Sequence, residues 1–502
     1  MADPDAMSKG AEPSIVESFS IEGLYGYRTI SLSSKYAATI LIAKNGSGKT
    51  TLLAALDAFL RGQLSRLRDL DFRQIRCKLR GSSEIVLKRE HLHSYLTFER
   101  IGHEARRFDL EPFVLLGFIE GYAGDFEVLF ADDEVPTKLI HKLGYDRNEV
   151  HAFCLSFKAS LIDHVPEVRE AVTAIRKSLV GTEIVYLPTY RRIELAIVPV
   201  NRPERPNRRR AVVPGIRASL YSGEIQFGLA DILERLSQLN QRIVSDSNLG
   251  YREISASIIN ELIDGRFDLV TPTPEEIPEK EELELFFSRL KDQRRRYGPY
   301  DELSLPNIDR IYTGQDISDE RNRFLRYFLA KLNTVIRATS DIETLVRAFI
   351  DNCNNYLSSR DLSTDLPGRA SAVGEGDIDD KVLTLSRRDL KVTVRSLKAG
   401  RPIPLDALSS GEKQMISLFA KLFLYPENKI VLIDEPELSL SIDWQKQILV
   451  DVINAPLCRQ VIAITHSPFI FDNALEPFAK SLVSSIDSDK SLGVAEEEED
   501  DE

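Results

Sequence analysis

The feature that most constrains the fold is an apolar segment that leads through a glycine-rich loop into an apolar helix pattern. Residues 37–43 are mostly apolar and predict a short buried strand. The sequence KNGSGKT follows at 44–50, and the next residues place leucine, alanine and phenylalanine at helical spacing. Glycines let a backbone fold around an anion, so that N–H groups and the start of the helix point at phosphate oxygens. This order predicts a phosphate-binding loop.

The loop approximates the nucleotide-binding pattern GxxxxGK[ST], with Ala43 at the first glycine position. Alanine fits there if its backbone φ is negative. Lys49 would reach the β- and γ-phosphates of ATP, and the Thr50 hydroxyl would bind Mg²⁺. The alternative is a glycine-rich turn before a core helix. The predicted nucleotide-binding residues of the loop are Asn45, Gly46, Ser47, Gly48, Lys49, Thr50 and Thr51.

A second apolar run, at 429–433, ends in two carboxylates, Asp434 and Glu435. Asp434 would bind Mg²⁺, and Glu435 would orient and deprotonate the attacking water. By itself the run also fits any strand that is followed by an acidic turn. Together with the loop at 44–50 it predicts the catalytic part of an ATP site.

Two further segments have both a structural and a functional interpretation. LSSGEKQ at 408–414 precedes an apolar helix pattern, so it fits a helix N-cap with a first-turn glutamate, or an anion site at Ser410 and Gly411. VIAITHSP at 461–468 is a buried strand pattern that ends at His466, which fits either a structural histidine or one that contacts a ligand.

The four motifs, in their order along the chain (44–50, 408–414, 429–435 and 461–468), resemble those of ABC-type ATPases of the SMC/RecF/OLD-like group. In that superfamily the signature motif of one protomer closes over ATP that another protomer holds. The resemblance therefore implies that chains pair head to head, that Ser409, Ser410, Gly411 and Glu412 contact nucleotide, and that His466 acts with Glu435 on the γ-phosphate. Gln226 is one candidate for the Q-loop glutamine, and Gln74 is the other.

The fold that the resemblance implies is an α/β ABC-ATPase head, split by a long, mainly helical insertion arm. The head would combine a mixed sheet around the phosphate-binding loop with an antiparallel β subdomain. The predicted divisions are a disordered leader (1–13), the N-terminal half of the head (14–110), a helical insertion (111–180), a return to the head (181–230) that includes an arginine-rich loop (201–217), a helical arm (231–360), a flexible loop (361–380), the C-terminal half of the head (381–485) and an acidic disordered tail (486–502).

Composition limits the class of protein. A hydrophobic content of 43% excludes a wholly disordered chain, and no apolar run reaches the length of about 18 residues that a membrane span needs. The polar, acidic N-terminus does not fit a secretory signal, and the four cysteines lack the CxxC spacing of a zinc hook. We therefore expect a cytoplasmic protein.

Charge is unevenly distributed along the chain. The formal net charge of −13 disfavours DNA binding by the whole surface, and the last residues, 496–502, are all acidic. Residues 201–217 carry six arginines against one glutamate. This arginine-rich loop could contact phosphates, dock onto an acidic partner or the acidic tail, or be a solvated loop.

Three strings, IEGLYGYRTISL, YLPTYRRIE and LSSGEKQMISL, are similar to the PtuA-like ATPases of Septu and retron-associated anti-phage systems. Those proteins work with an HNH nuclease, PtuB, and in retrons also with a reverse transcriptase and its RNA and DNA. The resemblance implies an ATP-hydrolysing defence subunit whose nuclease is a separate chain. His91 and His93 lack an HNH context, and the stretch after His466 is short for a Toprim nuclease. The alternatives are a RecF-like DNA repair ATPase and an ATP-dependent scaffold with little turnover.

Overall fold

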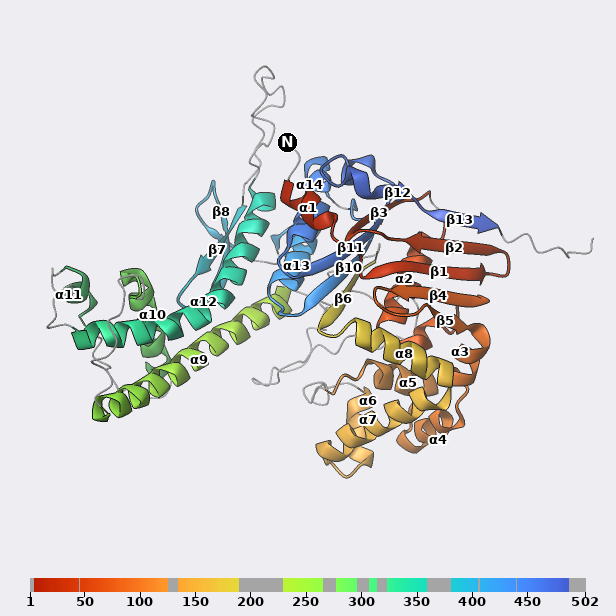
Figure 1. Ribbon diagram of the computed structural model, residues 1–502, viewed down its shortest axis with the longest axis horizontal. Helices are drawn as coiled ribbons and strands as arrows, with labels where there is room; N and C mark the ends of the chain where they lie inside the picture. Colours follow the sequence, from red (N-terminus) through yellow and green to blue (C-terminus); the bar gives the residue numbers. More distant parts are fainter. Residues whose placement is uncertain are drawn as a thin grey trace, which may run out of the picture. The chain divides into compact units, whose positions relative to one another are not determined.

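The computed structural model describes residues 4–44, 46–124, 134–188, 229–264, 277–295, 307–313, 323–358, 381–404, 407–438 and 440–486. The chain forms two compact units: Met1–Gln226 together with Pro426–Glu502, and Phe227–Tyr425 (Figure 1). Several predictions fall outside the described residues, namely those for Asn45, Gln226, the arginine-rich loop 201–217, the flexible loop 361–380 and the acidic tail.

A parallel sheet forms the centre of the first unit. Its strands are β3 (Ala38–Ile42), β6 (Thr182–Leu187), β10 (Asn428–Asp434), β11 (Cys458–Thr465) and β12 (Ala479–Ser481), in the order β12-β3-β11-β10-β6. Every neighbouring pair is parallel, so the prediction of a mixed sheet is wrong for the described strands. The reason is that these strands are buried on both faces, as the consecutive buried residues of β10 show. The carboxyl ends of β3, β10 and β11 therefore lie together at one edge.

The predicted antiparallel sheet is confirmed. Its strands are β1 (Val16–Leu24), β2 (Arg28–Ser33), β4 (Gln74–Leu79), β5 (Ile85–Lys88) and β13 (Val483–Ile486), in the order β13-β2-β1-β4-β5. One buried side chain of β11 ties this sheet to the parallel one. The Gln460 amide oxygen accepts hydrogen bonds from the N–H groups of Ile15 (2.9 Å) and Val16 (2.8 Å), and its amide nitrogen donates to the Val16 carbonyl (3.1 Å).

Helices surround the two sheets of the first unit, and the sequence patterns at 50–64 and 112–180 predict helices there. The phosphate-binding loop leads into α2 (Lys49–Leu60), which is buried along almost its whole length. The other helices are η1 (Leu64–Leu67), α3 (Arg89–Leu96), α4 (Glu99–Phe108), α5 (Pro112–Gly121), α6 (Glu134–Lys142), α7 (Arg147–His164), α8 (Pro166–Ser178), α14 (Ile442–Asn454), η8 (Pro468–Ile470) and η9 (Glu476–Phe478).

The N-terminal leader differs from the disordered segment that the sequence predicts, because it contains a helix, α1 (Pro4–Gly10). Ala6 is fully buried, and Gly10 lies against the ring of Phe478. The Lys9 ammonium group donates a hydrogen bond to the carbonyl of Ala455, the residue that ends α14 (2.5 Å). A cation at a helix C-terminus is favourable, so this contact explains why the polar leader docks.

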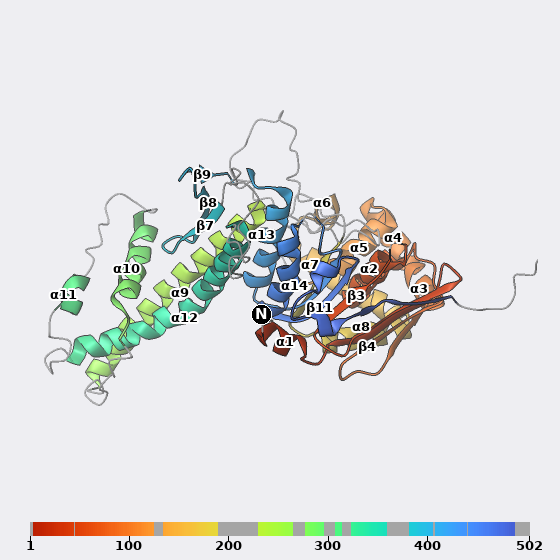
Figure 2. The same ribbon diagram turned by 90° about the horizontal axis from the view of Figure 1, so that it is seen from above.

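The second unit is mainly helical in its described residues. It contains α9 (Leu229–Ile263), α10 (Lys280–Arg295), α11 (Ile308–Thr313), α12 (Arg323–Leu357) and α13 (Ser410–Phe423). The two long helices, α9 and α12, lie side by side (Figures 1 and 2). Glu261 of α9 links them, because it accepts hydrogen bonds from the Tyr327 hydroxyl and from the Lys331 ammonium group (2.9 Å). None of the described helices is long and apolar enough to cross a membrane.

The sequence pattern at 381–405 predicts a pair of strands with one turn, whereas the structure has a three-stranded sheet with two turns. The strands are β7 (Lys381–Ser386), β8 (Lys391–Ser396) and β9 (Pro402–Ile403), in the order β7-β8-β9. The sequence predicts only the turn at 398–401. The turn at 387–390 is missed because it contains no glycine or proline, and Leu390 adopts its positive φ of 49°. These strands and α13 belong to the second unit, so the predicted C-terminal half of the head, 381–485, is divided between the units.

A buried acid lies beside the C-terminal end of α2. The Glu120 carboxylate, at the end of α5, accepts hydrogen bonds from the Ser65 N–H (3.0 Å), the Ser65 hydroxyl and the Tyr95 hydroxyl (3.0 Å). Burial raises the pKa of Glu120 to about 7, although these hydrogen bonds and Lys158 lower it. The pKa of Lys158 is in turn lowered to about 8, chiefly by burial and then by the charge of Arg176.

This arrangement predicts that stability falls as the pH rises from about 4.5 to about 7. Over that range the folded chain keeps a proton on Glu120 that the unfolded chain has released, because the pKa rises from 4.5 to about 7 on folding. Glu120→Gln removes this titration. The stability of the wild type relative to the variant should therefore drop by up to about 3 kcal/mol over this range.

Urea denaturation at several pH values measures the effect. The exposed Glu99 of α4 offers a matched control, because Glu99→Gln removes a carboxylate from the same unit without touching the buried cluster. Parallel curves of stability against pH for the wild type and Glu120→Gln would show that Glu120 does not titrate in this way.

Candidate nucleotide-binding site

The loop between β3 and α2 has the backbone that an anion-binding loop requires. Gly46 and Gly48 have φ angles of 77° and 84°, a region that side chains other than glycine rarely adopt. At Gly48 a Cβ atom would also lie 2.4 Å from the Ile30 side chain and 2.5 Å from the Arg28 guanidinium group. Ala43 does not have a positive φ, so alanine fits where the pattern has glycine.

Arg28 is a residue near the loop that the sequence does not point to. It begins β2, and its guanidinium group donates a hydrogen bond to the Gly46 carbonyl (3.3 Å). The second guanidinium nitrogen approaches Gly48. This places a positive charge against the phosphate-binding loop. The contact depends on how β2 lies relative to the loop, and the spacing of residues in the sequence does not show this.

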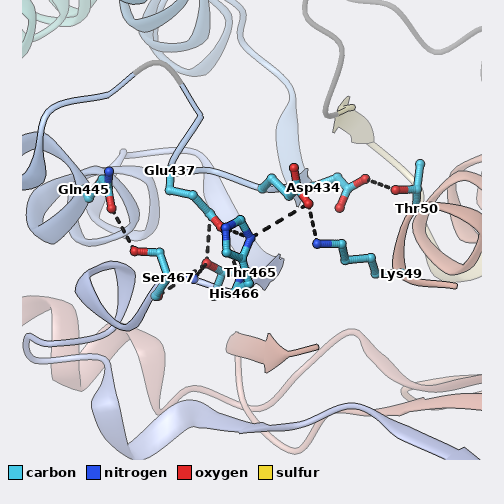
Figure 3. A network of polar contacts seen from close by, with 9 residues as sticks. Lys49, Thr50, Asp434, Glu437, Gln445, Thr465, His466 and Ser467 are labelled. Atoms are coloured by element: carbon cyan, nitrogen blue, oxygen red, sulfur yellow. Dashed lines mark hydrogen bonds and ion pairs between the residues drawn. The ribbon is translucent and has the colours of Figure 1, made fainter. Parts of the chain in front are cut away.

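Lys49 and Thr50 contact the two carboxylates at the carboxyl end of β10, Asp434 and Glu435. The Thr50 hydroxyl donates a hydrogen bond to the Asp434 carboxylate (2.5 Å) (Figure 3). The Lys49 ammonium group forms an ion pair with Glu435. Asp434 is fully buried. A hydroxyl and a carboxylate are oxygen ligands that suit Mg²⁺, which in nucleotide sites takes its other ligands from phosphates and water. The predicted metal ligands are therefore compatible with Mg²⁺.

Glu435 has a constrained backbone. Its φ is 51°, and its N–H donates a hydrogen bond to the Ile464 carbonyl of β11 (2.9 Å). A side chain other than glycine in this conformation costs of the order of 1 kcal/mol, which the surrounding contacts must offset. The carboxylate is thus held at the end of β10, directed toward Lys49.

His466 lies at the end of β11, next to the same carboxylates. Its Nδ1 atom is 2.8 Å from Glu437 Oε1 and 3.9 Å from Glu435 Oε1 (Figure 3). The imidazole is 54% exposed, so solvent and ligands can reach it. Glu437 is a second residue that the sequence does not single out, although it directly follows the Asp434–Pro436 segment. Because Glu435 pairs with Lys49 and lies near the imidazole, the position of His466 is compatible with contact to a bound phosphate.

The predicted signature residues lie in the second unit, where Ser409 and Glu412 form a capping box at the start of α13. The Ser409 hydroxyl accepts a hydrogen bond from the Glu412 N–H (3.3 Å), and the Glu412 carboxylate accepts one from the Ser409 N–H (2.6 Å). Glu412 also pairs with Lys381 (3.0 Å). The structure thus has the helix N-cap that the sequence of this segment allows. Ser410 is exposed at the helix N-terminus, where backbone N–H groups favour anions.

The structure therefore brings together Lys49, Thr50, Asp434, Glu435 and His466 within the first unit. Ser409, Ser410, Gly411 and Glu412 belong to the second unit. Of the two Q-loop candidates, Gln226 lies outside the described residues, and Gln74 lies in β4, where its amide donates a hydrogen bond to Glu22. The contact with Glu22 places Gln74 in a polar pair of the antiparallel sheet.

Comparison with known proteins gives one family match. Residues 345–472 match the family described as "AAA domain, putative AbiEii toxin, Type IV TA system". Among solved structures, the chain is matched to the Smc head domain with an extended coiled coil, bound to the C-terminal domain of ScpA, from Pyrococcus furiosus. The identity is 12% and the TM-score 0.32, over 94% of this chain and 96% of that one. No curated protein matches the chain. The chain thus contains a segment, with Asp434, Glu435 and His466 in it, that is similar to AAA-family ATPase domains.

Proposed function

We propose that this protein binds ATP with Mg²⁺ and hydrolyses it. The observation that carries the proposal is the convergence of Lys49, Thr50, Asp434, Glu435 and His466 at the carboxyl ends of three neighbouring parallel strands. Ligands of open α/β sheets bind at this edge. The family match at 345–472 supports the same class of activity.

Each side chain has a role that follows from its contacts. Lys49 leaves Glu435 for the β- and γ-phosphates, which frees Glu435 to accept a proton from the attacking water. Arg28 adds a second positive charge at the loop. Thr50 and Asp434 would hold Mg²⁺, which would supply positive charge against the phosphates. His466 contacts the γ-phosphate from the end of β11.

We also propose that ATP pairs two chains, with the start of α13 in one chain completing the ATP site of the other. Ser410 is exposed at the N-terminus of a helix of 14 residues. The resemblance of LSSGEKQ to a signature motif supports this role. Backbone N–H groups there can approach a phosphate only if the side chain at 410 is small.

Ser410→Arg should therefore abolish ATP hydrolysis and ATP-dependent pairing while leaving ATP binding intact. The bulky cation would occupy the space that the phosphate needs, yet an exposed N1 position tolerates it without loss of fold. Light scattering with and without ATP measures pairing, and Ser410→Ala is the control that keeps the backbone groups accessible. Normal assembly and turnover by Ser410→Arg would contradict the composite site.

For the biological setting we propose an anti-phage defence complex in which this ATPase controls a separate HNH-type nuclease of the PtuB kind. The strings that resemble PtuA-like ATPases support this proposal, and the same resemblance implies a retron reverse transcriptase with its RNA and DNA as a further partner. A RecF-like repair ATPase and a scaffold with little turnover are the alternatives. An HNH or reverse transcriptase gene beside this one favours defence, and repair genes favour the RecF-like alternative.

The purified chain should accordingly hydrolyse ATP slowly and leave DNA and RNA intact with Mg²⁺ or Mn²⁺. Cleavage is expected only after the HNH-type partner is added. In this proposal, that partner supplies the residues that bind the metal ion for phosphodiester hydrolysis. Gel assays with labelled DNA and RNA measure this. Metal-dependent nicking by the purified chain, if a point mutation in its own residues abolished it, would overturn the proposal.

A further inference from the structure

Glu437 is a buried carboxylate that joins the loop after β10 to the end of β11. Only 8% of its side chain is exposed. It accepts hydrogen bonds from the Thr465 hydroxyl (2.8 Å) and from the His466 N–H (3.1 Å), and its Oε1 atom lies 2.8 Å from His466 Nδ1 (Figure 3). Glu437 therefore contacts both the backbone and the ring of the same histidine.

The hydrogen bonds from the Thr465 hydroxyl and the His466 N–H fix the Glu437 carboxylate, so its contact with Nδ1 can fix the ring. Thr465 is fully buried, and the His466 N–H belongs to the backbone at the end of a sheet strand, so neither donor can move far. The imidazole is 54% exposed, which means that packing alone does not hold it. At 3.9 Å, Glu435 is too distant for a hydrogen bond to the ring.

The contact also favours one position for the hydrogen of the ring. An ionised carboxylate can only accept, so the 2.8 Å ion-pair contact between Glu437 Oε1 and His466 Nδ1 is favourable when Nδ1 carries the hydrogen. In the neutral ring Nε2 is then without a hydrogen, and in the protonated ring it is a donor that can bind a phosphate oxygen. Only Nε2 remains available for a ligand.

We infer that Glu437 is a positioning residue, which holds His466 by Nδ1–H and thereby presents Nε2 to the γ-phosphate. This inference rests on the proposed ATPase function, because the phosphate is the ligand that Nε2 would contact. Glu437 itself does not touch the reacting atoms. Its effect on turnover is exerted through the orientation and tautomer of one ring.

The decisive experiment compares the wild type with Glu437→Ala by ¹⁵N NMR of histidine-labelled full-length chain without nucleotide. His466→Gln identifies the His466 signals. At a pH where the ring is neutral, the wild type should show hydrogen on Nδ1, and Glu437→Ala should show it on Nε2, which the free imidazole ring prefers. Glu437→Gln should retain the Nδ1–H signal, because an amide oxygen still accepts from Nδ1.

Steady-state kinetics of ATP hydrolysis gives the second readout. Glu437→Ala should lower kcat by about tenfold to a hundredfold with little change in KM, because the ring is misoriented while the phosphate-binding loop is intact. Glu437→Gln should recover most of this loss. Thr465→Val is a matched control: it removes one hydrogen bond of Glu437 but not the ring contact, so it should keep Nδ1–H.

The outcomes separate this inference from the proposed function. Absence of hydrolysis by the wild type would refute the ATPase proposal, whereas the tautomer measured without nucleotide reports on Glu437 alone. Hydrogen on Nδ1 in Glu437→Ala, or an unchanged kcat in that variant, would overturn the positioning role. If Glu437→Ala did not fold, hydrogen on Nε2 in the neutral wild-type ring would overturn it equally.

Discussion

Lys49→Ala is expected to weaken ATP binding by about tenfold to a hundredfold. Hydrogen bonds to charged groups contribute about 1.5–3 kcal/mol, and Lys49 supplies the ammonium group nearest to where the β- and γ-phosphates would bind. The variant also removes the ion pair with Glu435, whose side chain is 15% exposed and remains partly solvated. Equilibrium binding of a fluorescent ATP analogue measures the effect.

The chain contains a matched control for this substitution. Lys44 is exposed just before the glycines, and its backbone carbonyl accepts a hydrogen bond from the Ser47 N–H (3.3 Å). Lys44→Ala should therefore bind the analogue about as tightly as the wild type. Equal affinities for Lys49→Ala and the wild type would mean that the loop at 44–50 is not the phosphate site.

Glu435→Gln is expected to lower kcat by about 10²- to 10⁴-fold while ATP binding is kept or tightened. The amide cannot take a proton from the attacking water, which is the step that general base catalysis accelerates. Binding is not weakened, because the neutral amide would no longer compete with the phosphates for the Lys49 ammonium group. Phosphate release gives kcat, and the fluorescent analogue gives affinity.

Glu427→Gln provides the comparison for this variant, because Glu427 is an exposed carboxylate just before the same strand, β10. Its turnover should equal that of the wild type. If Glu435→Gln hydrolysed ATP as fast as Glu427→Gln, another residue would have to be the base.

The site residues that could be predicted from the sequence are those whose immediate neighbours in the chain form a recognisable motif. Lys49 and Thr50 directly follow the glycines, and Asp434 and Glu435 directly follow an apolar strand. Because those strands are parallel, their carboxyl ends meet at one edge, and local motifs that are far apart in sequence come together.

Arg28 and Glu437 could not be predicted, because their contacts depend on how segments that are distant in the sequence lie together in the fold. Arg28 reaches the loop only because β2 lies beside it, and Glu437 reaches His466 only because β10 and β11 are neighbours. The helix at Pro4–Gly10 was missed for a similar reason: its polar sequence is stabilised by contacts of Ala6 and Lys9 with the folded unit. Asn45, Gln226 and the arginine-rich loop remain predictions.

The central claim is that the carboxyl ends of β3, β10 and β11 form one ATP site. A structure of Glu435→Gln with ATP and Mg²⁺ tests this most directly, because that variant should bind ATP without hydrolysing it. We predict a triphosphate in the loop at 44–50, Lys49 on the β- and γ-phosphates, Mg²⁺ bound by Thr50 and Asp434, and Nε2 of His466 at the γ-phosphate. An empty loop at saturating ATP, or ATP bound elsewhere on the chain, would contradict the claim.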